Sequence, residues 1–151
     1  MQEIIFRNLS DTTAFASEIV SWLVSLSAPV VIALHGDVGS GKTTLCHAIV
    51  SLLIPGAEFA GSPTFSLMHE YVADSGYFLI HMDCYRLKSA EEVFALGIEE
   101  RFLDTFFLIE WPEVMRNLLP EDAYHISLRR ELKEGVQHII CCHNLPLPSV
   151  V

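Results

Sequence analysis

An octapeptide of the form G-x-x-x-x-G-K-[ST] spans residues 36–43 and ends in Lys42 and Thr43. Its glycines allow the backbone to curl so that successive N–H groups point inward, which suits phosphate binding. Lys42 adds a positive charge, and the hydroxyl of Thr43 is a suitable oxygen ligand for Mg²⁺. The pattern predicts a loop that binds the phosphates of a nucleotide. Its predicted binding residues are Asp37, Val38, Gly39, Ser40, Gly41, Lys42, Thr43 and Thr44.

The segments on both sides of this loop have the composition that such a loop requires. Residues 29–34 are apolar and β-branched, as in a buried parallel strand, and residues 44–53 carry apolar side chains at helical spacing. A glycine-rich turn with an incidental lysine is the alternative, but it would require neither flank. The order strand, loop, helix therefore favours phosphate binding.

Two acidic residues follow apolar runs that are typical of buried strands: Asp83 after residues 79–82, and Glu110 after residues 107–109. Ligand sites in open α/β sheets lie outside the carboxyl ends of the strands, and a phosphate loop needs a carboxylate there to hold Mg²⁺. Acids also follow strands simply because loops are polar. The two residues together are therefore a stronger indication than either alone.

The segment Ser62-Pro63-Thr64-Phe65 is a further candidate, because a Ser-Pro turn presents hydroxyls that could reach a terminal phosphate or a metal. An ordinary Ser/Thr-Pro turn explains the same residues, so this segment is a weak indication when taken alone.

Length and composition predict one compact domain over residues 1–151, without a linker. Hydrophobic residues make up 51% of the chain, yet no apolar run is long enough to cross a membrane. The start of the chain lacks the basic and apolar regions of a secretion signal. We therefore expect a cytoplasmic protein that has no contact with membranes.

The formal net charge of −10 opposes the attraction to phosphates on which nonspecific nucleic-acid binding relies, and it suits contact with another protein. The four cysteines show no C-x-x-C spacing and are expected to be reduced. A metal site at Cys141-Cys142-His143 is disfavoured, because adjacent residues of a strand point to opposite faces. No zinc-enzyme motif is visible in the sequence.

The pattern of apolar residues predicts an α/β, P-loop NTPase-like fold with three layers, in which a mostly parallel central sheet carries additional antiparallel strands. Strands are expected at 3–7, 30–35, 67–71, 77–82, 105–109, 125–128 and 137–142. Helices are expected from a Ser10 cap to residue 26, and at 43–54 and 89–96. A charged turn is expected at 129–135, and a flexible tail at 143–151.

Five segments together resemble the TsaE (YjeE) family, the small ATPase component of the bacterial machinery that makes threonylcarbamoyladenosine in tRNA. They are residues 36–44, 62–65, 81–87, 96–98 and 108–113. The resemblance runs in unbroken order from about residue 11 to residue 113. Its D-x-Y-R-L and I-E-W-P elements are more specific than the phosphate loop. Ser40 stands where the family usually has alanine, and the resemblance fades after Glu113.

The resemblance implies that the cofactors are ATP and Mg²⁺. Thr43 and Glu110 would hold the metal, and Asp83 would share the metal and its water network. Asp83, Glu110 and Thr64 are the expected catalytic residues. Further roles are implied for Tyr85, Arg86 and Trp111, with Ser10 and Thr12 near the adenine and Arg130 as a basic residue near the nucleotide. The implied partners are proteins of the TsaB and TsaD type, with tRNA contacted only indirectly.

The leading hypothesis is slow ATP hydrolysis that drives a partner assembly, because the sequence shows no unambiguous arginine finger. A small-molecule kinase would share the phosphate loop, but it usually needs an arginine-bearing lid. A GTPase is less favoured, because no N-K-x-D segment exists. In a non-enzymatic alternative, ATP mainly orders residues 62–65 and exposes a protein-binding face.

Overall fold

The computed structural model describes residues 1–64, 66–74 and 76–148. The strands are β1 (Gln2–Phe6), β2 (Val31–His35), β3 (Met68–Val72), β4 (Phe78–Asp83), β5 (Phe106–Glu110), β6 (Tyr124–Lys133) and β7 (Val136–His143). The helices are α1 (Leu9–Ser25), α2 (Lys42–Leu53) and α3 (Ala90–Phe94), with 3₁₀ helices η1 (Glu99–Leu103) and η2 (Pro112–Met115).

The seven strands of the described residues belong to one sheet in the order β1-β7-β6-β2-β5-β4-β3. The four central strands β6, β2, β5 and β4 are parallel, and the pairs β1–β7, β6–β7 and β3–β4 are antiparallel. The predicted mixed α/β fold with a mostly parallel centre is confirmed. Glu110 pairs with Leu34 on one side and with Asp83 on the other, so β2, β5 and β4 end at the same edge.

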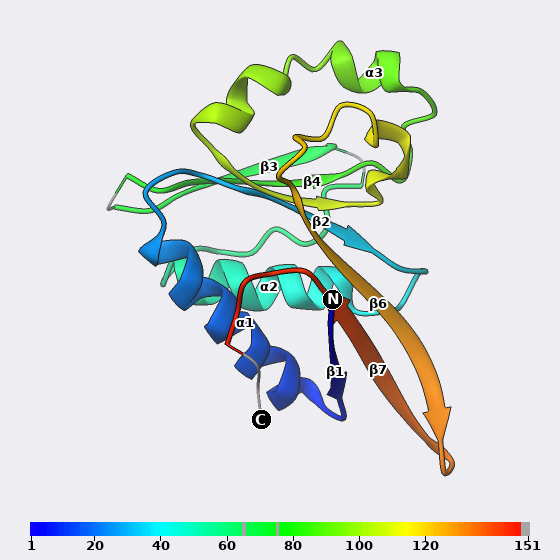
Figure 1. Cartoon of the computed structure of the whole chain (residues 1–151). Helices are drawn as coiled ribbons and strands as arrows, with labels where there is room; N and C mark the ends of the chain where they lie inside the picture. The colour runs from blue at the N-terminus through cyan, green and yellow to red at the C-terminus, as the bar shows by residue number, and fades with distance from the viewer. Residues whose placement is uncertain (65, 75, 149–151) are drawn as a thin grey trace.

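Helices cover both faces of this sheet (Figure 1). Leu79 and Leu108 point to the face that α1 and α2 cover. Ile80 and Phe107, the neighbours of these leucines along each strand, point to the opposite face, where α3, η1 and η2 lie. The alternation explains why these strands are apolar throughout, because each strand is buried on both sides.

The cap of helix α1 lies two residues earlier than the predicted Ser10 cap. Asn8 has an extended backbone, with φ −158° and ψ 176°, and its side chain accepts a hydrogen bond of 3.1 Å from the N–H of Asp11. The Asp11 carboxylate in turn accepts the N–H of Arg7 at 2.7 Å. Ser10 already has helical conformation, so it cannot act as the cap.

The C-terminal hairpin is longer than predicted. Residues 129–133, expected in a turn, continue β6 and pair with β7. The turn is formed by Glu134 and Gly135, both at positive φ (51° and 78°), which is the backbone of a tight two-residue hairpin. The charged side chains that suggested a turn lie on the part of β6 that extends beyond its pairing with β2.

The tail prediction is wrong for residues 143–148. His143 is the last residue of β7, and Leu145 and Leu147 are buried in the core that packs against α1 and α2. The amide of Gln2 donates to the carbonyl of Leu147 at 3.3 Å. Apolar residues at alternate positions let the tail cover the core although it forms no regular element. Predictions for residues 149–151, Phe65 and Ser75 lie outside the described residues.

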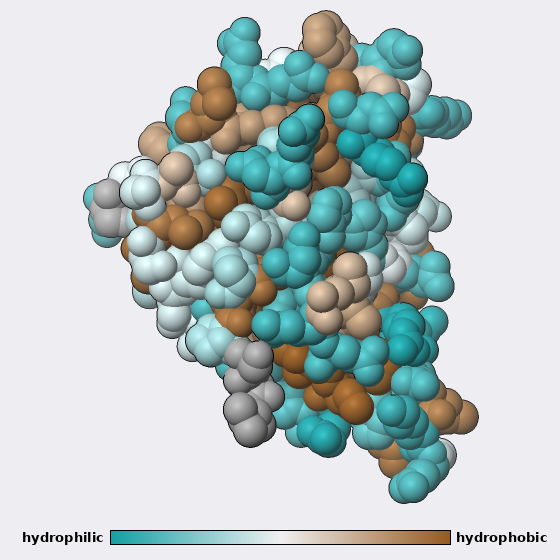
Figure 2. All heavy atoms as spheres, in the orientation of Figure 1, coloured by the Kyte–Doolittle hydropathy of each residue, from teal (hydrophilic) through white to brown (hydrophobic). Residues whose placement is uncertain are grey.

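Hydrophilic and hydrophobic residues alternate over the face shown in Figure 2. Leu132 and Val136, at the tip of the β6–β7 hairpin, are 74% and 54% exposed. Of the helices in the described part of the chain, none combines the length and apolar character needed to cross a membrane.

The buried His143 generates a prediction about stability. Its ring packs 5.0 Å from that of Phe15, neither ring nitrogen has a partner within the described residues, and burial together with the N-terminal charge lowers its pKa. The unfolded chain, with a pKa near 6.5, therefore takes up the proton first as the pH falls. The contribution of the neutral, buried His143 to the free energy of unfolding is therefore complete above about pH 6.5 and is lost as the pH falls below that value.

We expect His143→Phe to lose less stability than the wild type between pH 7.5 and pH 5.5, as measured by urea unfolding at both values. The loss should shrink rather than vanish, because the pKa values of His125 and His69 are also lowered by burial. Exposed His47, replaced by Gln, is the control. An equal loss in the wild type and in His143→Phe would contradict the assignment.

Candidate functional site

The glycine loop connects β2 to α2 and has the conformation that its sequence requires. The φ angles of Gly36, Gly39 and Gly41 are 141°, 76° and 101°. Gly41 is the N-cap of α2 and makes no side-chain capping bond, so the first N–H groups of the helix remain available to an anion. A β-carbon at Gly36 would lie 2.3 Å from the carbonyl oxygen of Leu128 on β6.

Lys42 is buried at the start of α2. Its ammonium donates to the carbonyl oxygens of Gly36 and Asp37, the latter at 3.0 Å, and lies 4.1 Å from the centre of the Trp111 ring. Burial lowers the pKa of Lys42, and the nearby carboxylates of Glu110 and Asp83 oppose that shift. A cation is therefore held inside the loop beside two acids.

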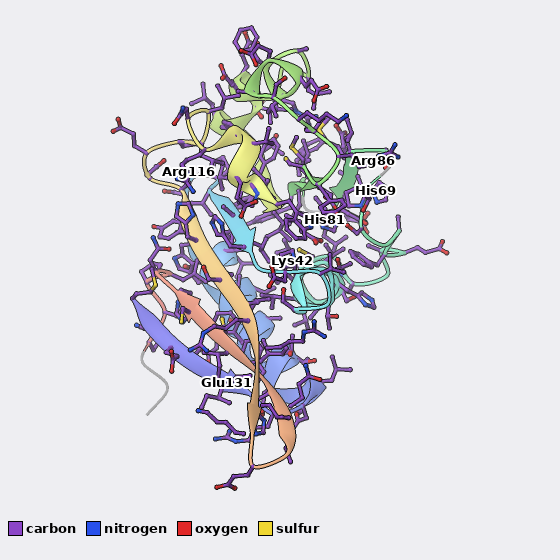
Figure 3. The ribbon with its side chains drawn as sticks, turned by 90° about the vertical axis from the view of Figure 1, so that its right-hand side faces the viewer. Lys42, His69, His81, Arg86, Arg116 and Glu131 are labelled. Carbon is purple, nitrogen blue, oxygen red and sulfur yellow. The ribbon has the colours of Figure 1, made fainter. Side chains whose placement is uncertain are left out.

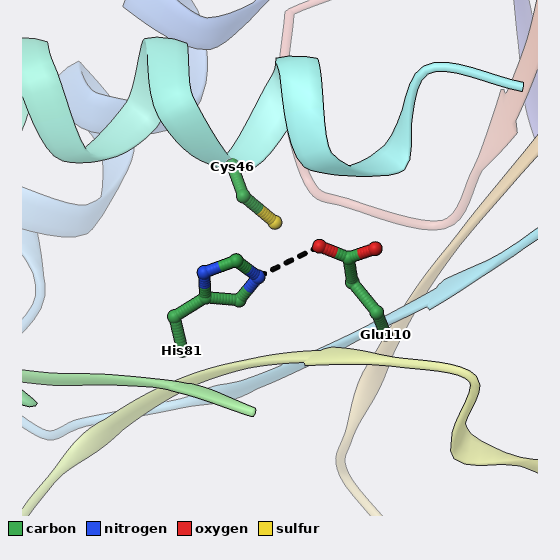
Figure 4. Close-up of side chains that lie close together, drawn as sticks. All are labelled: Cys46, His81 and Glu110. Carbon is green, nitrogen blue, oxygen red and sulfur yellow. Dashed lines mark hydrogen bonds and ion pairs between the residues drawn. The ribbon is translucent and has the colours of Figure 1, made fainter. Parts of the chain in front are cut away.

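Glu110 receives hydrogen bonds from two elements. The hydroxyl of Thr43, in the first turn of α2, lies 3.1 Å and 3.0 Å from its two carboxylate oxygens. The Nε2 of His81 on β4 lies 2.7 Å from Oε1, in a contact that is almost completely buried (Figure 4). Figure 3 shows Lys42 and His81 in the middle of the molecule. His81 contacts the Glu110 carboxylate, and the charge of this carboxylate acts on Lys42.

Asp83 organises the segment that precedes β3. Its Oδ2 accepts the hydroxyls of Ser62 at 2.6 Å and Thr64 at 2.9 Å, and its Oδ1 accepts the N–H of Tyr85 at 2.8 Å. The hydroxyl segment and the carboxylate predicted from the sequence are thus in direct contact. Whether they act on a nucleotide remains a prediction.

A cavity of about 390 Å³ lies between these groups. It is lined by loop residues and by Ser62, Thr64, Asp83, Tyr85, Glu110 and Trp111. Trp111 has left-handed backbone angles (φ 55°, ψ 55°), and its ring lies 4.9 Å from that of Tyr85. Such a backbone is costly for a bulky residue, and strain of this kind is concentrated at functional sites.

A second cavity of about 210 Å³ adjoins the first, and Gly41 and Thr44 line both. Thr12 and the buried Ser40 also line it, whereas Ser10 is exposed in α1 and does not. Arg130 lies outside both cavities, beside the loop: a β-carbon at Gly39 would be 3.6 Å from its Nη1.

Sequence reasoning assigned no role to several residues of this region. Arg7, Asn8 and Gln137 line the second cavity. They were missed because only the sheet order β1-β7-β6 brings both ends of the chain to the loop. His81 lies in a motif that the sequence already singled out, two residues before Asp83 on the same face of β4, and that spacing was an available signal.

Histidines also fix the far side of the loop. His35 lies directly before Gly36. Its Nδ1 is 3.1 Å from the Glu113 carboxylate, and its Nε2 is 2.9 Å from Nδ1 of His125. Burial, followed by the effect of His35, lowers the pKa of His125. These contacts connect η2, β2 and β6 beneath the loop.

Comparison with known proteins agrees with this geometry. Residues 6–139 match the family model described as threonylcarbamoyl adenosine biosynthesis protein TsaE. A tRNA threonylcarbamoyladenosine biosynthesis protein TsaE from Rickettsia bellii is 33% identical over 127 residues, covering 84% of this chain and 85% of that protein. The protein of the same name from Aquifex aeolicus is 33% identical over 114 residues, covering 75% and 78%.

The crystal structure of YdiB from Bacillus subtilis has the same fold, with a TM-score of 0.68 at 24% identity over 93% of this chain and 83% of that one. The chain is thus a mixed α/β protein with a glycine loop at the carboxyl edge of its parallel strands. It belongs to the TsaE family. The resemblance stated from its motifs is confirmed.

The close approach at Gly36 generates a prediction. Gly36→Ala combines a positive φ with a backbone clash against Leu128, whereas a β-carbon at Gly56 meets open space at φ 86°. We expect Gly36→Ala to destabilise the protein by about 3 kcal/mol or more, and Gly56→Ala by about 1 kcal/mol. Urea unfolding of both variants is the measurement. Similar losses would show that the contact with β6 does not constrain the loop.

Proposed function

We propose that this protein is a P-loop NTPase that binds ATP with Mg²⁺ and hydrolyses it slowly, in support of threonylcarbamoyladenosine formation in tRNA. The observation that carries the proposal is the contact between Thr43, which begins the helix after the glycine loop, and Glu110, which ends the neighbouring strand. It joins a phosphate-type loop to a metal-binding carboxylate, the pairing that phosphoryl transfer requires.

The loop would hold the phosphates of ATP. The N-terminus of α2, which no side chain caps, favours negative charge, and α2 has no acidic residue in its first turn to oppose it. The Lys42 ammonium, which now donates to two loop carbonyls, is close enough to exchange one of them for a phosphate oxygen. Trp111 and the loop limit how far this ammonium can move.

The oxygen donors at the edge of the sheet suit Mg²⁺, which prefers carboxylate, hydroxyl and water ligands. Thr43 and Glu110 would hold the ion, with Asp83 reaching it directly or through water. The ion would neutralise charge on the phosphates. A threonine hydroxyl has lone pairs to spare, so Thr43 can keep its donation to Glu110 while it accepts a ligand role.

The remaining catalytic task is to orient a water molecule against the terminal phosphate. Asp83 and Thr64 are in mutual contact at the cavity, and either could accept or direct that water. Holding the reactants in place in this way, rather than covalent chemistry, would supply the rate enhancement. We propose that turnover is slow until a partner completes the site.

The second cavity is the proposed place for the base and ribose. It continues the loop past Gly41 and Thr44, it is mostly apolar, and Thr12 offers it a hydroxyl. Arg130, beside Gly39, is positioned to approach the phosphates from the hairpin. Ser10, which is exposed outside this cavity, keeps only the role that the family resemblance implied.

The proposed partners are proteins of the TsaB and TsaD type, in the cytoplasm, with tRNA contacted only through them. The net charge of −10 supports contact with protein rather than direct contact with RNA. Both comparison proteins at 33% identity are named for biosynthesis of threonylcarbamoyladenosine in tRNA, which supports the same pathway.

The test compares ATP binding and hydrolysis in the wild type, Lys42→Ala and Glu110→Gln. Lys42→Ala removes a charged donor and should weaken ATP binding about ten- to a hundredfold. Glu110→Gln should keep ATP binding but lower Mg²⁺-dependent turnover about a hundredfold or more. Glu100→Gln, exposed on η1 and outside both cavities, is the control and should resemble the wild type.

Calorimetry with ATP and a phosphate-release assay, each with and without TsaB- and TsaD-type proteins, give the two readouts. Added partners should raise the wild-type rate, and Glu110→Gln should still bind them. Wild-type affinity for ATP in Lys42→Ala, or unchanged turnover in the reconstituted assembly, would contradict the proposal. Transfer of labelled phosphate to a metabolite instead of water would favour the kinase.

A further inference from the structure

A thiol, an imidazole and a carboxylate meet beneath the glycine loop. The ligand atoms of Cys46, His81 and Glu110 all lie within 4.8 Å of one another, and all three residues are buried. Figure 4 shows the thiol directed towards the gap between the imidazole and the carboxylate. We propose that these residues form a site for a thiophilic divalent cation of the Zn²⁺ type, which shares Glu110 with the proposed Mg²⁺ site.

The ligand set favours such a cation. Zn²⁺ binds thiolate, imidazole and carboxylate together, whereas Mg²⁺ takes oxygen ligands. Each ligand comes from a different element, since Cys46 lies on α2, His81 on β4 and Glu110 on β5. For this reason the site has no spacing motif in the sequence. The sheet register and the position of α2 bring its ligands together.

The observed distances are close to those of a metal site. Metal–ligand bonds of about 2.0–2.3 Å in a tetrahedron place the ligand atoms roughly 3.3–3.6 Å apart. The contact of 2.7 Å between His81 and Glu110 would open by less than about 1 Å, and the thiol would approach by up to about 1.5 Å. Side-chain rotation supplies movements of this size without moving the backbone.

The surroundings are suited to retaining a bound ion. His81 packs against the ring of Phe59, with centroids 5.7 Å apart and planes at 17°, which restricts the orientation of the imidazole. Glu110 and Thr43 line the larger cavity, so an ion can enter from that side. A water or hydroxyl oxygen from the cavity completes four ligands.

Binding is balanced by the release of one proton. The thiol of Cys46 loses its proton to solvent when the sulfur coordinates the ion. The proton that His81 donates to Glu110 moves to Nδ1, which has no partner among the residues that the structure describes, and Nε2 then coordinates. The Glu110 carboxylate binds as it stands. No oxidant or other reactant is required.

Occupation of this site inhibits the hydrolysis proposed above, because the carboxylate of Glu110 cannot serve both ions in the same position. This consequence depends on the proposed function. The binding of the ion does not, since it follows from the three ligands alone.

The test titrates Co²⁺, as a coloured substitute for Zn²⁺, into the complete protein without nucleotide. We expect one ion per chain, visible absorption of tetrahedral Co²⁺ and a near-ultraviolet thiolate-to-cobalt band. Cys46→Ser and Cys46→Ala should abolish the thiolate band and weaken binding at least tenfold. Alanine preserves the small, apolar character of this buried position if serine does not fold. Cys142→Ser, on β7, is the control and should match the wild type.

The second arm measures Mg²⁺-dependent ATP hydrolysis with added Zn²⁺. Wild type and Cys142→Ser should be inhibited at least tenfold, whereas Cys46→Ala should retain its activity. Absence of the thiolate band in the wild type, or its persistence in both Cys46 variants, overturns the site. Equal inhibition of wild type and Cys46→Ala overturns the inhibitory role. The cobalt titration needs no ATPase activity, so it decides on the site even if the proposed function fails.

Discussion

The hydrogen bond from Thr43 to Glu110 joins the glycine loop and α2 to the end of β5 in the candidate site. The strand pairing and the loop conformation that allow this bond also position the other residues of the site. Parallel pairing aligns β5 with β2, so Glu110 ends its strand beside the start of the loop. The clash-free approach of Gly36 to Leu128 lets that loop turn back over the sheet and begin α2 within reach of the carboxylate. A shift of β5 by one residue would turn Glu110 to the opposite face.

The buried charged groups around this contact are compensated by hydrogen bonds. Lys42, Asp83 and Glu110 are all buried, yet each has hydrogen-bond partners: loop carbonyls for the lysine, hydroxyls for the aspartate, and Thr43 with His81 for the glutamate. Isolated charges in such a place would be strongly destabilising. The hydrogen bonds therefore let the folded state tolerate charged groups beside the loop.

Much of this centre was predictable because its signals are local. The glycine loop, its flanking strand and helix, and the acids after two apolar runs depend on short stretches of sequence, and the structure has the strand, loop and helix in that order. The hairpin of β3 and β4 was also predicted correctly. Each of these features follows from periodicity or turn chemistry within about ten residues.

The errors and omissions have a different cause, since they depend on contacts between distant segments. Asn8 rather than Ser10 caps α1, because the backbone conformation decides between two good capping residues. Leu145 and Leu147 were assigned to a flexible tail because no local feature of the sequence shows that they pack against the core. The second cavity requires both chain ends, and the meeting of Cys46, His81 and Glu110 requires three elements in register.

We propose that Thr43 and Glu110 together hold one divalent ion beside the phosphates of ATP. A double-mutant cycle of Thr43→Ala and Glu110→Gln, read as the affinity for Mn²⁺ by electron paramagnetic resonance with a non-hydrolysable ATP analogue, tests it most directly. We expect each substitution to weaken Mn²⁺ binding and the double variant to be weakened by much less than the sum of the two losses, with a coupling of about 1 kcal/mol or more. Additive losses, or unchanged Mn²⁺ affinity in either single variant, would contradict it.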